Sequence, residues 1–305
     1  MKSIIKSKSE RKRLLFYSLM IALPLAQVLI FYFGVNINSI LLAFKQYDGT
    51  TGAYSWVGFD NFGRVLTEIF TDPTAEWRFA FQNSFIAWIV CTSIGMTLAL
   101  FFSYYIFKKG IGRNFFRVVL FMPSIISSIV MVILFTYVVD NFIPDVIFAL
   151  FGTEMRGLLS NPDTTMLMIY LYTILMGFGT NVLLLSSAMS GISDSIIEAA
   201  QLDGANNIRL FWHVVLPQVF PTFVTIFIVS IAQLFSNQLN LYSFYGGYAE
   251  AQYATVGYLL YKRTVSASYA EYPALASIGI LLTIVIIPVT LGIRKLLEKV
   301  GPSDE

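Results

Sequence analysis

Charged residues are scarce in this chain. Only 12% of its 305 residues are Asp, Glu, Lys or Arg, whereas 56% are hydrophobic, and the mean hydropathy is +0.70. Soluble domains carry roughly 25% charged residues. This shortage of charge in so apolar a chain excludes an ordinary soluble domain and predicts a membrane protein.

Several residue types that carry chemistry are also nearly absent. Cys91 is the only cysteine, so no disulfide can form within the chain. His213 is the only histidine, which excludes paired-histidine sites and leaves no Cys/His cluster with metal-ligand spacing. No G-x-x-x-x-G-K-[ST] segment occurs, so the chain lacks that means of binding nucleotide phosphates. We therefore expect no catalytic residue, no metal site and no cofactor on this chain, and no nucleic-acid partner.

Six uncharged windows are long enough for a helix of about 20 residues to cross a bilayer. They predict an all-α membrane protein with spans at about 14–35, 80–106, 116–139, 165–190, 218–240 and 273–293. The basic N-terminal segment before the first window resembles a secretory signal, but the apolar run is too long for one, so we expect a retained helix. The predicted organisation is an N-terminal segment 1–13, a membrane domain 14–296 and a tail 297–305.

The Lys and Arg residues are unevenly distributed between the connecting segments. If the N-terminus is cytoplasmic, the inside segments hold 14 of the 20 basic residues and 7 of the 18 acidic ones, a net charge of +7 against −5 outside. Basic residues are enriched on the cytoplasmic side of membrane proteins. We therefore expect both termini, and the large loop 191–217, to face the cytoplasm.

Apart from Arg117 at the start of the third, the six predicted spans contain no Asp, Glu, Lys or Arg. Ion-coupled and proton-coupled transporters usually keep ionisable groups at membrane depth. The predicted spans therefore argue against a secondary transporter that powers itself, and against an intramembrane enzyme with acid–base groups.

The loop 191–217 has the pattern of two short helices. Ser195 and Glu198 have the spacing of a capping box, and Asp203-Gly204 predicts a tight turn. A second helix is expected from about Asn207 to Val215, ended by Leu216-Pro217 because the residue before proline disfavours helix. The pattern alone leaves two interpretations open, a compact loop without a partner or a surface that docks onto one.

The sequence E-A-A-x-x-D-G-A followed by an aromatic residue and L-P is similar to the signature loop of importer permeases of the ATP-binding cassette superfamily. The matching positions are Glu198, Ala199, Ala200, Asp203, Gly204, Ala205, Phe211, Leu216 and Pro217. Further segments resemble the carbohydrate-uptake, maltose-type branch: 57–62, Asn83-Ser84, Arg117 with 121–123, and Gly177-Phe178. The resemblance runs from about residue 14 onward. Ser193 departs from it, because that family often has proline there, and the maltose protein's large outside domain is absent.

This resemblance implies a type I importer permease in a prokaryotic plasma membrane. An outside solute-binding protein would deliver a sugar to a heterodimer of this chain and a second permease. Two ATPase subunits, which would hold the ATP and Mg, would grip the nine signature positions and drive the sugar pathway between inside-open and outside-open states.

Polar residues at helical spacing in two spans are candidates for the sugar pathway. Span five carries Ser230, Gln233, Leu234 and Asn237, and span four carries Thr173, Met176, Gly177, Thr180 and Asn181. Buried polar groups must face protein or a wet cavity. Composition alone favours the other interpretation, in which these groups bond across contacts between helices. The resemblance favours the pathway for Gln233, Asn237 and Gly177. Phe235, Tyr170 and Tyr172 are candidate rings for the sugar, with no choice between them.

Two other functions stay open from the sequence. The same importer class could carry a glycerol-phosphate ester or an oligopeptide, although a phosphate would favour a cation in the pathway. A pore or carrier that needs no ATPase is the alternative from another class.

Overall fold

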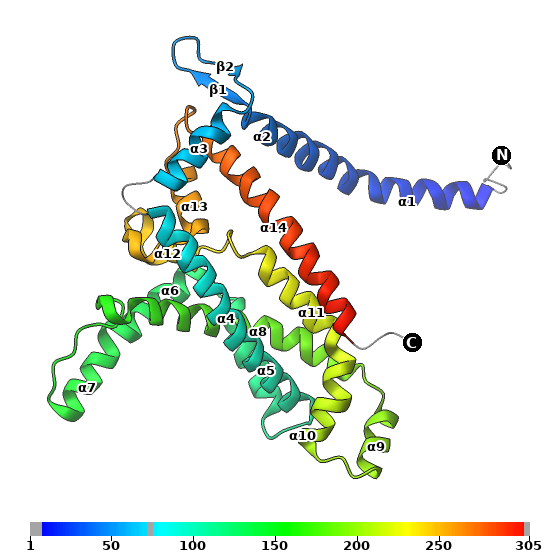
Figure 1. Cartoon of the computed structure of the whole chain (residues 1–305). Helices are drawn as coiled ribbons and strands as arrows, with labels where there is room; N and C mark the ends of the chain where they lie inside the picture. Colours follow the sequence, from blue (N-terminus) through cyan, green and yellow to red (C-terminus); the bar gives the residue numbers. More distant parts are fainter. Residues whose placement is uncertain (1–7, 72–75, 302–305) are drawn as a thin grey trace. The chain divides into compact units, whose positions relative to one another are not determined.

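The computed structural model describes residues 8–71 and 76–301, and these are mostly helical (Figure 1). Within them, six helical stretches are long and apolar enough to cross a membrane: Lys12–Leu42, Glu76–Phe107, Ser128–Phe151, Pro162–Ser190, Asn207–Ala232 and Tyr272–Lys299. The predicted all-α class and the predicted number of spans are confirmed, but the bounds of several spans differ. Residues 1–7 and 302–305 of the predicted terminal segments lie outside the described residues.

The first and last helices are longer than predicted. The first stretch joins α1 (Lys8–Gln27), the π-helix η1 (Val28–Val35) and α2 (Asn36–Leu42). The last helix, α14 (Tyr272–Val300), continues past the expected end near 293. Helices do not stop where charge begins, because long basic side chains can reach water from a helix end.

The third predicted span, 116–139, is wrong. Helix α5 (Arg113–Phe121) ends in a 3-10 turn, η2 (Met122–Ser124), and Ser127 is extended, with ψ 133°. Pro123 has no backbone N–H to continue an α-helix. The membrane-length helix follows this break, as α6 (Ser128–Tyr137), the π-helix η3 (Val138–Phe142) and α7 (Ile143–Phe151).

The expectation that no ionisable residue lies in a span therefore fails for this helix, which contains Asp140 and Asp145. The Asp140 carboxylate accepts hydrogen bonds from the Leu159 N–H (2.7 Å) and the Ser160 hydroxyl (2.8 Å). Asp140 thus orders the loop that leads into α8 (Pro162–Ser190). Other spans also include charged residues near their ends.

The prediction placed the fifth span, 218–240, too far toward the C-terminus. The helix runs without interruption through α10 (Asn207–Leu210), the π-helix η4 (Phe211–Val215) and α11 (Leu216–Ala232). The expected stop at Leu216-Pro217 is wrong, because a π turn precedes Pro217, which then lies in the first turn of α11, where a missing N–H costs little. After Ala232 the chain continues in turns, with Leu239 and Asn240 at positive φ.

The chain divides into two compact units. In the first, residues up to 68 together with 267–281, an antiparallel hairpin joins β1 (Lys45–Asp48) to β2 (Ala53–Trp56). It leads to α3 (Asp60–Thr71). The Asn61 amide donates to the carbonyls of Ala43 (2.9 Å) and Lys45 (2.7 Å), which fixes the start of α3 against the hairpin.

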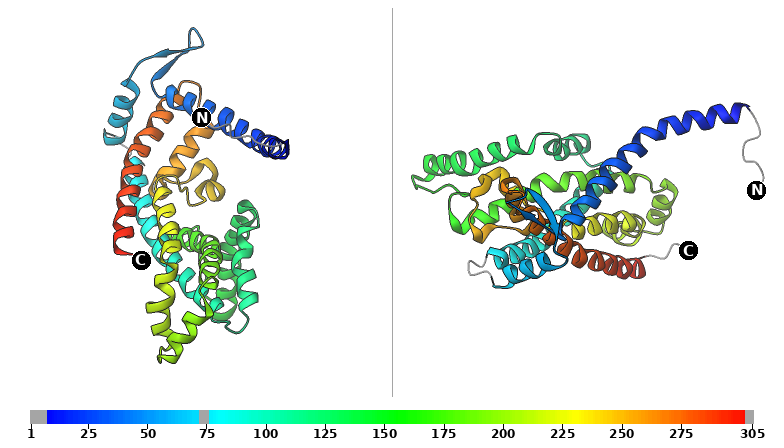
Figure 2. Two further views of the ribbon diagram at one scale, coloured as in Figure 1. Left: turned by 90° about the vertical axis from the view of Figure 1, so that its right-hand side faces the viewer. Right: turned by 90° about the horizontal axis from the view of Figure 1, so that it is seen from above.

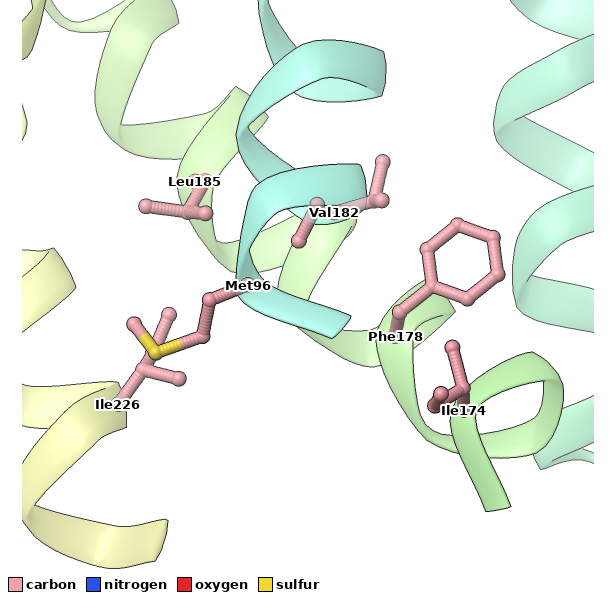
Figure 3. Packing of buried hydrophobic residues seen from close by; sticks show 7 residues of the cluster. Met96, Ile174, Phe178, Val182, Leu185 and Ile226 are labelled. Carbon is pink, nitrogen blue, oxygen red and sulfur yellow. The ribbon is translucent and has the colours of Figure 1, made fainter. Parts of the chain in front are cut away.

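The second unit, residues 69–266 and 282–301 of the described chain, is built on α4 (Glu76–Phe107) and α8 (Pro162–Ser190). Their shared core contains Met96, Phe178 and Val182, and α11 contributes Ile226, which the Met96 thioether approaches (Figure 3). Gly179 of α8 lies against the Leu120 carbonyl at the end of α5, so closely that no Cβ fits there.

Short elements follow α11: α12 (Leu241–Tyr245), the 3-10 turns η5 (Gly246–Tyr248) and η6 (Ala251–Tyr253), and α13 (Val256–Ser266). They are tied to α4, because the Asn83 amide donates to the Gln252 carbonyl (2.7 Å) and the Ser84 hydroxyl accepts from the Val256 N–H (3.0 Å). Within this unit α12 lies at one end, whereas α9 (Asp194–Leu202) and α10 lie at the other (Figures 1 and 2).

Candidate functional site

Helix α9 forms the first half of the signature loop, which comprises residues 191–217. The structure places its N-cap at Ser193, with ψ 135°, and its first residue at Asp194. The predicted capping box is therefore wrong, because Ser195 already lies inside the helix, where its hydroxyl is 2.7 Å from that of Ser193. Asp194 provides a negative charge in the first turn, where the helix dipole favours it.

The turn after α9 is confirmed as a glycine turn. Gly204 has φ +80°, and two backbone bonds close the helix end: Gly204 N–H to the Gln201 carbonyl (3.0 Å) and Ala205 N–H to the Ala200 carbonyl (3.0 Å). This pair of bonds is the Schellman arrangement, which requires a left-handed residue at the position of Gly204. The turn reverses the chain into α10.

The second half of the loop starts at a cap that sequence reasoning missed. The Asn206 side-chain oxygen accepts from the Arg209 N–H (2.8 Å) and so caps α10. An Asn just before an expected helix start is a known N-cap signal and could have been used.

The nine signature positions divide into two groups. Glu198, Ala199, Asp203 and Gly204 are exposed, and these can meet another protein. The other five are partly buried and pack the loop onto the helices: Ala200, Ala205, Phe211, Leu216 and Pro217. The structure thus brings all nine into one loop but presents only four of them to the surroundings.

Exposed apolar side chains accompany those four. Leu202 is 88% exposed and Ile208 is 72% exposed, one on each side of the Gly204 turn, and Trp212 and Ile196 are also exposed. Sequence reasoning did not select them. The sequence feature that could have identified them is an apolar residue within a polar loop. The two short helices turn these positions outward.

The loop is anchored to the end of α4. The Tyr104 hydroxyl donates to the Asn207 carbonyl (2.7 Å), and the Tyr104 ring meets that of Phe211 edge-on, with centroids 4.9 Å apart. Below them, Met189, Leu210 and Val215 form a buried apolar cluster. The loop is therefore packed against α4, α8 and the continuous helix 207–232.

A cavity of about 420 Å³ lies between α4, α8, α11 and the turns after α11. Eight of the nine predicted pathway residues line it: Thr173, Gly177, Thr180, Asn181, Ser230, Gln233, Leu234 and Asn237. Met176 does not. The expected single helix face is wrong for Gln233, Leu234 and Asn237, because α11 ends at Ala232; they reach the cavity from turns instead.

The aromatic residues that line the cavity are not the three candidate rings Phe235, Tyr170 and Tyr172. Tyr172 is buried between Phe135 and Phe244, and its hydroxyl donates to the Ser128 carbonyl (3.3 Å). Tyr170 and Phe235 are also outside the lining. Among the described residues the aromatic lining consists of Trp88 and Phe178.

The lining combines apolar side chains with polar ones that carry no charge. Hydroxyl groups come from Ser84, Thr92, Thr173, Thr180, Thr225, Ser230 and Thr255, and amides from Asn181, Gln233 and Asn237. Over residues 8–71 and 76–301, no Asp, Glu, Lys or Arg side chain lines this cavity, and no group of three His, Cys, Asp or Glu side chains could hold a metal ion. Such a cavity can bind a neutral, hydroxyl-rich molecule through hydrogen bonds.

The chain is similar to known transport proteins. The family model "Binding-protein-dependent transport system inner membrane component" matches residues 92–299. The arabinooligosaccharides transport system permease protein AraP of Bacillus subtilis (strain 168) is 28% identical over 273 residues, covering 88% of this chain and 84% of AraP. The multiple sugar-binding transport system permease protein MsmF of Streptococcus mutans is 23% identical and covers 85% of this chain and 87% of its own length.

The fold matches a solved structure as well. One chain of a bacterial alginate ABC transporter, solved in complex with an alginate pentasaccharide-bound periplasmic protein, superposes with a TM-score of 0.76 at 18% identity, covering 97% of this chain and 99% of that one. The six apolar helices, the signature loop and the family match over residues 92–299 all indicate the same family of membrane transport components. This chain therefore belongs to the family of inner membrane components of binding-protein-dependent transport systems, as a multi-pass subunit of a prokaryotic plasma membrane.

Proposed function

We propose that this chain forms one half of the pathway of an importer for a neutral sugar or oligosaccharide, driven by separate ATPase subunits. The uncharged, hydrogen-bonding cavity carries the proposal. Its hydroxyl and amide groups match the hydroxyls of a sugar, and a hydrogen-bonding site rejects ligands that leave its buried polar groups unpaired. The names of AraP and MsmF, which are sugar-transport proteins, point the same way.

An uncharged lining favours a neutral sugar over an acidic one. A uronate or a phosphate ester carries a negative charge, and burying that charge without a partner costs several kcal/mol or more. Lys and Arg are the usual partners of such groups. We therefore infer that this chain's half of the pathway takes neutral sugar units, in contrast to the alginate transporter that shares its fold.

The proposed power source is a pair of ATPase subunits that hold ATP and Mg and contact the signature loop. Glu198, Asp203 and the exposed Leu202 would provide the contact, with Gly204 setting the turn between them. Interfaces of this kind place apolar side chains at the centre and polar ones at the rim. Because no charged relay lines the cavity among the described residues, the work is supplied from outside the chain.

Helix 207–232 links the two sites directly. Its 26 residues span about 39 Å, from the signature loop to the cavity turn at Gln233. A tilt of this helix at its loop end therefore moves the cavity wall at its other end. Such a movement would switch the pathway between its two faces while a binding protein delivers sugar from outside and a second permease completes the cavity.

The test is to assemble the transporter with the Leu202→Asp variant. Placing a charge at an exposed apolar contact should release the ATPase subunits from the purified complex and stop uptake, while the protein still inserts. Tyr248→Ser is the matched control, because Tyr248 is 93% exposed in η5, next to α12 at the other end of the unit. Retention of the ATPase subunits by Leu202→Asp would remove the proposed coupling surface.

A second measurement tests the power source. The chain reconstituted alone in vesicles should give no sugar flux, whereas the complete assembly with ATP should. Flux from the chain alone would instead favour the pore or carrier.

A further inference from the structure

We propose that Trp88 is the aromatic platform on which a sugar ring stacks in the cavity, and that Ser230 positions it. This inference rests on the proposed sugar pathway. The sequence alone does not indicate this binding role for the indole ring. The ligand class is a neutral pyranose or furanose unit of the transported sugar.

The indole is held in a fixed orientation. Its Nε1–H donates to the Ser230 hydroxyl of α11 (3.2 Å), and that hydroxyl in turn donates to the Phe227 carbonyl (2.7 Å). Ser230 has one hydroxyl hydrogen, and this bond uses it. The role of Ser230 in the cavity is therefore to orient Trp88, with only an acceptor left for a ligand.

Neighbouring rings restrict the indole further. Phe85 lies 6.1 Å away at 34°, and Phe227 lies 5.9 Å away at 49°, measured between ring centroids and planes. A ring that is already held in place loses little conformational freedom when a ligand binds to it. Trp88 is thus preorganised, and it is only partly buried.

The other aromatic residue in the lining cannot play this role. Phe178 is 6% exposed and belongs to the packed core of Figure 3, where its ring also lies 5.9 Å from that of Phe102. Exposing Phe178 to a ligand would open the core between α4 and α8. Trp88 is therefore the ring that a ligand in the cavity can reach.

The chemistry of a sugar fits a platform with polar groups around it. One face of a sugar ring presents C–H groups, which are weakly positive, and an aromatic face is negative. The hydroxyls at the ring's edge point outward, where Asn181, Gln233 and Asn237 of the same cavity can bond them. Stacking and hydrogen bonding then act on different parts of the same sugar unit.

The experiment uses the complete transporter in proteoliposomes, with labelled arabino- and galacto-oligosaccharides as probes. Trp88→Leu should lower the uptake rate about tenfold, as loss of an aromatic contact worth about 1.4 kcal/mol would, and leave ATP hydrolysis stimulated by the binding protein intact. Trp88→Phe keeps a ring and should retain most of the uptake. Phe101→Leu removes an exposed ring from the same helix, outside the lining and away from Trp88, and should change nothing.

Three results would overturn the platform. They are wild-type uptake by Trp88→Leu, an equal loss in Trp88→Phe and Trp88→Leu, or loss of stimulated ATP hydrolysis together with uptake in Trp88→Leu, which would mark a purely structural residue. Failure of the proposed function looks different. In that case the unmodified transporter would carry neither probe while it still carried an oligopeptide or a glycerol-phosphate ester.

Discussion

The Tyr104 hydroxyl, near the end of α4, donates a 2.7 Å hydrogen bond to the Asn207 carbonyl at the start of α10. This bond ties the signature loop to a helix that also lines the cavity. The Tyr104 ring contact with Phe211 reinforces it. Loop and cavity are therefore joined along α4 as well as along helix 207–232.

Removing that hydroxyl should weaken coupling without unfolding the protein. Tyr104→Phe keeps the ring contact and loses one hydrogen bond, worth about 1 kcal/mol. We expect the number of sugar molecules moved per ATP to fall about two- to fivefold, measured as uptake and hydrolysis in the same vesicles. The neighbouring Tyr105→Phe is the control, because the Tyr105 hydroxyl bonds to the Ile111 carbonyl (2.6 Å) instead. Equal losses in the two variants would contradict this assignment.

The left-handed backbone at Gly204 should limit which residues can replace it. A Cβ at this position would meet no other atom within 4 Å, so any cost comes from φ +80° and not from crowding. A side chain in this region costs roughly 1–2 kcal/mol, more for a branched residue. Gly204→Val should therefore uncouple uptake from ATP hydrolysis, whereas Gly204→Asn should retain coupling because Asn tolerates this conformation. If valine were as active as asparagine, the turn would not matter.

Two glycines of α8 separate packing from transport. A methyl group on Gly179 would collide with the Leu120 carbonyl, and such overpacking costs about 1–3 kcal/mol. Gly179→Ala should lower the melting temperature of the purified protein. Gly177→Ala meets nothing within 4 Å and adds its methyl to the cavity. It should keep the melting temperature and lower uptake about tenfold, as one extra carbon in a pocket does. The reverse pattern would argue against the cavity as the pathway.

The hairpin turn at Asp48 should withstand acid. Bonds from the Thr50 hydroxyl, the Thr50 N–H and the Thr51 hydroxyl hold the pKa of Asp48 at about 2, against an ordinary value of 3.8. Because the folded pKa is the lower one, the contribution of these bonds is complete above about pH 4 and is lost as the pH falls through about 2. Carboxyl NMR of the protein in micelles should show Asp48 still ionised at pH 3. Titration near 3.8 would mean that the turn is open in solution.

Local patterns in the sequence predicted what depends on a few neighbouring residues. The six apolar stretches follow from the cost of leaving backbone groups unbonded in lipid, and the turn at Gly204 follows from glycine's access to positive φ. The signature loop and eight cavity residues were found from their spacing and the family resemblance. The third and fifth spans were misplaced, because uncharged windows do not register a break such as that around Pro123 or a π turn before Pro217.

Residues far apart in the sequence decided the rest, through their packing. Tyr172 and Trp88 are both aromatic residues of apolar helices, yet Tyr172 is buried between two rings while Trp88 is turned to the cavity by Ser230, 142 positions away. Composition alone determined that this is a membrane protein, because so little charge cannot cover a soluble surface. Which rings, amides and exposed loop residues face a ligand or a partner was set by the tertiary structure, because a side chain's surroundings depend on which helices pack against its own.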